Sequence, residues 1–128
     1  MSDIHESGEN YLETILILQN RGVSVRSIDI VREMEISKPS VSRAMSILRE
    51  GGFVLVDPDG YITMTDAGME VAQRIYERHR VLTEWLVDLG VDEKTAAEDA
   101  CKIEHDISAV SFQKLKDHLR EKHNKNIK

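Results

Sequence analysis

The sequence contains a single cysteine, Cys101, and no long run of apolar residues. One cysteine cannot form an internal disulfide, and no stretch approaches the roughly 18 apolar residues that a membrane-spanning helix needs. The first ten residues, MSDIHESGEN, are acidic and polar, unlike a secretory signal. Internal repeats, low-complexity segments and Gly/Ser-rich linkers are also absent. These absences argue against a secreted disulfide-rich domain and a membrane protein, and we expect a cytoplasmic protein with no membrane partner.

The charges are unevenly distributed along the 128 residues. The formal net charge of −6 by itself argues weakly against nucleic-acid binding. Residues 19–56, however, carry six basic and four acidic side chains, whereas residues 83–106 carry eight acidic side chains and two lysines. A basic segment of this kind suits a nucleic-acid partner, and bound cations would relieve the acidic one.

Three helices are expected in the N-terminal half, over residues 7–20, about 26–34 and 38–50. The third follows from SKPSVSRAMSILREGG, in which Ser37 can cap the helix and Pro39 occupies the first turn. Apolar residues at positions 41, 44, 45 and 48 bury one face of this helix, and Gly51-Gly52 ends it. Two short strands, FVLV (53–56) and YITMT (61–65), then flank the turn sequence DPDG.

This order of helices followed by a hairpin describes a winged helix-turn-helix, in which the third helix enters the major groove of DNA. The exposed face of that helix carries serines and arginines and no acidic residue before Glu50. The alternative is a polar face that is merely solvated, or a winged helix that does not bind DNA. We predict DNA contacts from Arg26, Ser37, Lys38, Pro39, Ser40, Ser42, Arg43 and Arg49.

The C-terminal half is predicted to be entirely helical. Thr65 can cap a long helix over 66–89, Asp92 a helix over 93–106, and Ser108 a last helix. The predicted fold is therefore mainly α with a small β-hairpin wing. We place the winged helix in residues 1–70 and the helical domain in residues 71–128.

A candidate metal site lies in CKIEHD, residues 101–106. On a helix, Cys101, Glu104 and His105 would share a face, and thiolate, carboxylate and imidazole are the usual ligands of transition metals. The alternative is a polar patch on an acidic helix.

Two other helices carry further candidate ligands. His79 falls on the apolar stripe of the long helix, where it is either a core residue or a ligand. Asn10 and Glu13 lie at i and i+3 on the polar edge of the first helix, where a solvated carboxylate is the alternative for Glu13. Periodicity alone leaves open whether these helices meet.

The segments ENYLETI (9–15), SKPSVSRAM (37–45), HR (79–80) and CKIEHDIS (101–108) resemble the diphtheria-toxin-repressor family. That family includes the iron-dependent repressors and the manganese transport regulators. The resemblance implies a homodimeric repressor of metal-uptake genes, activated by metal and without an organic cofactor. It also implies a DNA-binding winged helix, followed by a helical domain that binds metal and dimerises. The chain resembles the short, two-domain form.

Position by position, the resemblance implies metal ligands at Asn10, Glu13, His79, Cys101, Glu104 and His105. Asn10 stands where the manganese branch has aspartate and the iron branch methionine. Cys101 stands where the manganese branch has glutamate and the iron branch cysteine. The implied ion is Mn²⁺ or Fe²⁺, with Co²⁺, Ni²⁺ or Zn²⁺ able to bind in vitro. Thr83 and Ala97 depart from the iron branch's second site, which we expect to be missing.

Two other functions remain open from the sequence. A winged-helix regulator that has lost metal control is supported by the neutral Asn10. A metal-dependent hydrolase would use a Cys/Glu/His-bound ion to activate water. No pocket motif or second acid–base pair accompanies it, so we expect no enzymatic activity.

Overall fold

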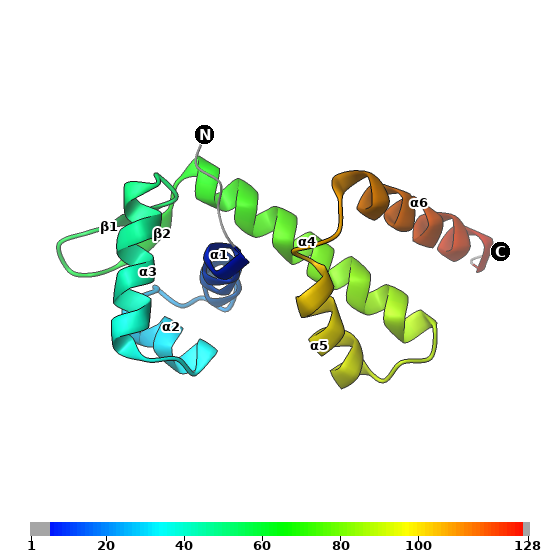
Figure 1. Cartoon of the computed structure of the whole chain (residues 1–128), viewed down its shortest axis with the longest axis horizontal. Helices are drawn as coiled ribbons and strands as arrows, with labels where there is room; N and C mark the ends of the chain where they lie inside the picture. Colours follow the sequence, from blue (N-terminus) through cyan, green and yellow to red (C-terminus); the bar gives the residue numbers. More distant parts are fainter. Residues whose placement is uncertain (1–5, 127–128) are drawn as a thin grey trace. The chain divides into compact units, whose positions relative to one another are not determined.

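The computed structural model describes residues 6–126 and divides into two compact units, Met1–Arg74 and Ile75–Lys128. Its described residues form six α-helices and one two-stranded antiparallel sheet, as Figure 1 shows. The predicted mainly α fold with a hairpin wing is therefore confirmed. The sequence predicted a boundary near residue 70, and the two units divide after Arg74, inside the fourth helix.

The N-terminal unit contains three helices and the hairpin. They are α1 (Glu6–Asn20), α2 (Ser27–Met34), α3 (Lys38–Glu50), β1 (Val54–Val56) and β2 (Ile62–Met64). Both α2 and α3 pack against α1, and α3 also contacts β1. Their apolar faces form a common core with the fully or almost fully buried side chains of Leu12, Ile15, Val25, Ile30, Val41, Leu48, Val54 and Ile62.

Local hydrogen bonds explain where α3 and the hairpin begin and end. The Ser40 backbone N–H donates to Ser37 Oγ at 3.3 Å, so Ser37 caps α3 as predicted. In the DPDG turn, the Gly60 N–H donates to the Asp57 carbonyl at 2.9 Å. Gly60 has φ of +88°, a conformation that glycine adopts without steric cost. The strands pair in the register Val54–Met64 and Val56–Ile62.

Arg26 fastens the hairpin to the start of α2. Its Nη2 donates to the Asp59 carbonyl at 2.8 Å, and its guanidinium lies 5.1 Å from the centre of the Tyr61 ring. An arginine held over an aromatic face is stabilised by cation–π attraction. The wing is thereby fixed to the helical body by a side chain that the sequence suggested only as a DNA contact.

The C-terminal unit is built from three helices. The helix α4 (Asp66–Asp88) begins in the N-terminal unit and continues into this one, followed by α5 (Glu93–Ile103) and α6 (Ala109–Asn126). The three predicted caps are confirmed, because Thr65, Asp92 and Ser108 each accept a hydrogen bond from a backbone N–H in the first turn of their helix. Buried apolar residues of this unit are Ile75, Leu82, Ala96, Ala100, Phe112 and Leu119.

Membrane insertion has no support in the helices of residues 6–126. None of them combines the length and the apolar character required to cross a bilayer.

Gly68 offers a test of how tightly α4 joins the hairpin. A Cβ at this position would overlap the carbonyl group of Phe53. We expect Gly68→Ala to lower the free energy of unfolding by about 2 kcal/mol, because backbone cannot move aside as a flexible side chain can. Urea unfolding followed by circular dichroism measures the loss.

Gly52→Ala is the matched control. Gly52 has φ of +82° but open space around its Cβ position, so an alanine there would be strained in its backbone without meeting a clash. We expect a loss of about 1 kcal/mol there. Equal losses at the two glycines would contradict the predicted contact between α4 and Phe53.

Candidate functional site

The segment after α5 is a turn. The helix ends at Ile103, Glu104 is its C-terminal cap, and the N–H groups of Asp106 and Ile107 both return to the Ile103 carbonyl at 3.0 and 3.1 Å. The prediction of a helix over 93–106 is therefore wrong in its last three residues. The reason is a tertiary contact, because Arg78 of α4 hydrogen-bonds the carbonyls of Glu104 and Ile107.

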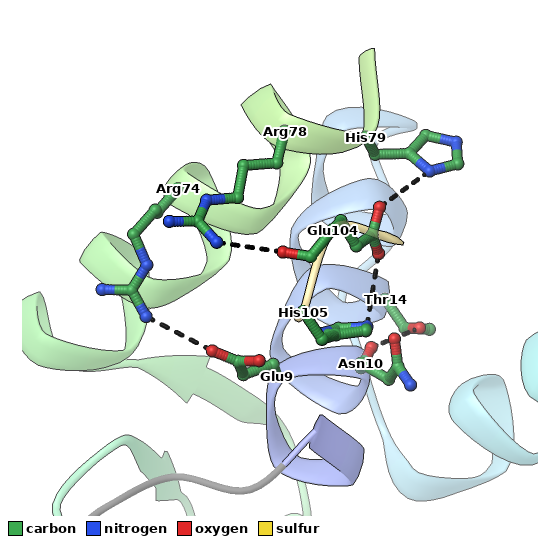
Figure 2. Close-up of polar contacts among 8 residues, drawn as sticks. All are labelled: Glu9, Asn10, Thr14, Arg74, Arg78, His79, Glu104 and His105. Carbon is green, nitrogen blue, oxygen red and sulfur yellow. Dashed lines mark hydrogen bonds and ion pairs between the residues drawn. The ribbon is translucent and has the colours of Figure 1, made fainter. Parts of the chain in front are cut away.

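The turn brings three of the predicted ligands together within the C-terminal unit, as Figure 2 shows. The Glu104 side chain is completely buried, and its Oε2 lies 2.9 Å from Nδ1 of His79. Its Oε1 lies 3.5 Å from Nε2 of His105, whose side chain is only 2% exposed. The His79 side chain remains 29% exposed. One carboxylate thus stands between two imidazoles.

The chemistry of this cluster suits a divalent transition metal. Among the described residues, Glu104 Oε1 is buried and accepts no hydrogen bond. A buried carboxylate oxygen without a hydrogen bond is energetically costly, and such groups often mark a functional site. An imidazole nitrogen 2.9 Å from a carboxylate must share a proton with it, and a cation can replace that proton. Two nitrogen donors and a carboxylate are a common ligand set for Zn²⁺, Fe²⁺ or Mn²⁺.

Cys101 differs from its neighbours in CKIEHD. It lies one turn earlier on α5 and is exposed, whereas Glu104 and the side chain of His105 are buried. Its place in a ligand set stays a prediction.

The other two predicted ligands, Asn10 and Glu13, lie on α1 in the N-terminal unit. Glu13 is 7% exposed, although it was expected on a polar edge. Glutamate is rarely buried unless it is paired, so the burial of Glu13 argues against the alternative of a solvated carboxylate. Asn10 is half-buried, and its carbonyl accepts a hydrogen bond from Thr14 Oγ1 at 2.8 Å.

The sequence did not identify two further polar residues, Glu9 in the N-terminal unit and Arg78 in the C-terminal unit. Glu9 Oε2 lies 3.3 Å from Arg74 Nη2 within the N-terminal unit, and the Glu9 side chain is 13% exposed. Arg78 falls on the buried stripe of α4, three residues after Ile75 and four before Leu82. A charged residue on an otherwise apolar stripe is the feature of the sequence that could have indicated its structural role.

The predicted DNA-contacting residues lie mainly on the outer face of α3. Exposed or partly exposed side chains on this face are Ser37, Lys38, Pro39, Ser40, Ser42, Arg43 and Arg49, and its first acidic residue is Glu50. Ser37 Oγ donates to Ser40 Oγ at 2.8 Å. Ile47, which the sequence did not single out, is 69% exposed one turn after Arg43. An exposed apolar residue on such a helix can contact a thymine methyl group.

Fold and site together define a class of protein. A winged helix-turn-helix with a basic, exposed α3 is followed by a helical unit in which a buried glutamate lies between two histidines. This combination is that of a DNA-binding regulator with a candidate metal centre.

Comparison with known families identifies the class more closely. Residues 3–62 match the N-terminal DNA binding domain of the iron dependent repressors, and residues 65–125 match their metal binding and dimerisation domain. An HTH-type transcriptional regulator of Methanocaldococcus jannaschii is 34% identical over 113 residues, which are 87% of this chain and 90% of that relative. The chain belongs to the iron-dependent repressor family, which includes the diphtheria toxin repressor.

Other relatives are longer. The diphtheria toxin repressor of Corynebacterium glutamicum is 31% identical over 124 residues, which are 96% of this chain and 54% of the repressor. The structure of the manganese regulator SloR superposes with a TM-score of 0.79 at 28% identity, covering 88% of this chain and 53% of SloR. The chain thus spans about half the length of these two relatives. The resemblance found in the sequence and the predicted fold class are both confirmed.

Asp92 caps the N-terminus of α5, the helix whose C-terminal cap is Glu104. Its carboxylate accepts a hydrogen bond from the Thr95 N–H at 3.0 Å. That bond holds the pKa of Asp92 below its ordinary value. A lowered pKa means that the ionised group stabilises the fold above its ordinary pKa, and that this contribution is lost as the pH falls through the lowered value.

We therefore expect Asp92→Ala to lower the thermal midpoint at neutral pH. Asp92→Asn should lose less, because an amide oxygen can still cap the helix. The difference between wild type and Asp92→Asn should shrink as the pH falls through the lowered pKa of Asp92, because the wild-type carboxyl is then protonated. Thermal melts across this pH range measure it, and a difference that grows on acidification would contradict the prediction.

Proposed function

We propose that the protein is a homodimeric repressor of metal-uptake genes whose binding to operator DNA is activated by Mn²⁺ or Fe²⁺. The observation that carries this proposal is the buried Glu104 carboxylate between His79 and His105. It lies in the part of the chain that matches the family's metal binding and dimerisation domain. If the cluster served only to stabilise the fold, Glu104 Oε1 would be expected to accept a hydrogen bond, and it accepts none.

His79, Glu104 and His105 would hold the ion in this proposal. Glu13 would add a second carboxylate, and Asn10 and Cys101 are the remaining candidate ligands. The burial of Glu13 supports its inclusion. Because nitrogen and thiolate donors bind later transition metals more tightly, we expect Co²⁺, Ni²⁺ and Zn²⁺ to bind in vitro as well.

Glu13 is the residue through which metal binding would reach the DNA-binding unit. It belongs to α1, and α1 packs against both α2 and α3. A bound ion supplies positive charge that neutralises the buried carboxylates of Glu13 and Glu104. If both carboxylates bind the ion best in the DNA-competent state, metal and DNA binding strengthen each other. In a dimer this fixes the spacing of the two recognition helices.

On the DNA, α3 would lie in the major groove. Arg43 would pair with a guanine, while Ser37, Lys38, Pro39, Ser40, Ser42 and Arg49 contact phosphates and base edges. Arg26 would act mainly by holding the wing, as its contacts with Asp59 and Tyr61 support.

We propose no catalytic activity, since the relatives are transcriptional regulators. We also propose a cytoplasmic location, because a regulator of this kind must reach chromosomal DNA.

A second candidate is a winged-helix regulator without metal control. The neutral Asn10, at a position where the manganese branch has a carboxylate, favours it. Such a protein would bind its operator equally well in the presence of a chelator.

The ligand set is tested by Glu13→Ala and His105→Ala. Each should abolish the metal-dependent part of DNA binding, because each removes a donor, and each should leave a folded dimer. Fluorescence anisotropy with labelled promoter DNA measures binding, and sedimentation measures the dimer. The controls are Glu6→Ala on the same helix as Glu13 and His118→Ala on α6, both exposed. Full metal activation of either ligand variant would refute the assignment.

DNA recognition is tested by Arg43→Ala. Loss of a bidentate base contact should weaken operator binding by about 1–3 kcal/mol, roughly 5- to 150-fold, with metal affinity unchanged. Arg120→Ala, an exposed arginine on α6, is the control for the loss of one positive charge. If Arg43→Ala reduced metal affinity and DNA affinity equally, the two functions would not be divided between the two units as proposed.

A further inference from the structure

Arg78 reaches from α4 to the backbone at the end of α5, as Figure 2 shows for the carbonyl of Glu104. Its Nη1 donates to the carbonyl of Glu104 at 3.1 Å and to the carbonyl of Ile107 at 2.9 Å. Its guanidinium also lies 5.6 Å from the centre of the Phe112 ring on α6. One side chain of α4 therefore contacts the end of α5, the following turn and α6.

These two carbonyls flank His105 in the sequence. Carbonyls at the end of a helix lack helical hydrogen-bond partners, and a buried one requires another donor. Here a single guanidinium nitrogen supplies both hydrogen bonds. Arg78 is also adjacent in sequence to His79. The same turn of α4 thus carries one candidate ligand and fixes the backbone that carries the other two, Glu104 and His105.

We propose that Arg78 is a positioning residue for the metal centre. It holds the turn over residues 104–107 so that the side chains of Glu104 and His105 converge with His79. Residues that orient metal ligands commonly contribute about 10- to 100-fold to metal affinity. This inference rests on the proposed function, because it requires His79, Glu104 and His105 to bind metal.

The charge of Arg78 makes the inference testable by the sign of the effect. A guanidinium near a cation site repels the cation. If Arg78 influenced the site only through its charge, its removal would strengthen metal binding. If it positions the ligands, its removal weakens metal binding in spite of the relieved repulsion.

The experiment is a Co²⁺ titration of the whole 128-residue chain by calorimetry and by the visible absorption of the bound ion. We expect Arg78→Ala to bind Co²⁺ about 10- to 100-fold more weakly than wild type. The absorption spectrum of its Co²⁺ form should also change, because the spectrum depends on coordination geometry. A merely stabilising residue would lower the thermal midpoint of the apo-protein without altering that spectrum.

Arg80→Ala is the matched control. Arg80 lies on the same helix and also stacks on an aromatic ring, that of Tyr76 at 5.8 Å. It should bind Co²⁺ with wild-type affinity and spectrum. An equal loss in Arg80→Ala would overturn the positioning role, since it would reflect the removal of any arginine from α4.

Arg78→Lys keeps the test decisive if Arg78→Ala does not fold. Lysine retains the positive charge and most of the aliphatic stem but lacks the planar fork. We expect its metal affinity to lie between those of wild type and Arg78→Ala. Wild-type or tighter binding by the folded Arg78 variants would overturn the inference. Failure of the wild-type protein to bind Co²⁺ would instead overturn the proposed function itself.

Discussion

The buried carboxylate of Glu104 is the constraint around which the C-terminal unit is organised. A carboxylate with no solvent exposure requires protons or cations beside it, and the structure supplies His79 at 2.9 Å and His105 at 3.5 Å. To place His105 there, α5 must end at Ile103, and Arg78 donates hydrogen bonds to the part-buried carbonyls of the turn. The end of α5, the turn that follows it and the position of Arg78 are thus all related to the buried carboxylate of Glu104.

The two units differ in the charge of their functional residues. The chain is acidic overall, with a net charge of −6, yet α3 presents lysine and arginine without an acid before Glu50. The acidic side chains of the chain are concentrated between residues 83 and 106. The basic surface suits phosphate, and the buried carboxylates suit a cation. Glu13, on the helix that packs against α2 and α3, is the residue that relates one to the other in our proposal.

Local signals in the sequence predicted most of the fold. The caps at Ser37, Thr65, Asp92 and Ser108 are formed within one turn of their own helix, and the DPDG turn closes through its own backbone. The end of α5 could not be predicted, because it depends on Arg78, which is remote in sequence. The contacts of Arg26 with Asp59 and Tyr61 were missed for the same reason, since these partners lie on the wing. Periodicity could place His79 on a stripe but could not show that Glu104 lies beside it.

The most direct test of metal activation is the affinity of the purified apo-protein for its own promoter DNA. Fluorescence anisotropy would be measured at fixed salt with chelator, and with Mn²⁺, anaerobic Fe²⁺, Co²⁺ or Zn²⁺ in parallel. We predict specific binding only when a divalent metal is present, with the order of potency showing how Cys101 influences metal preference. Equal binding in chelator would contradict metal control and leave a regulator that responds to another signal or to none.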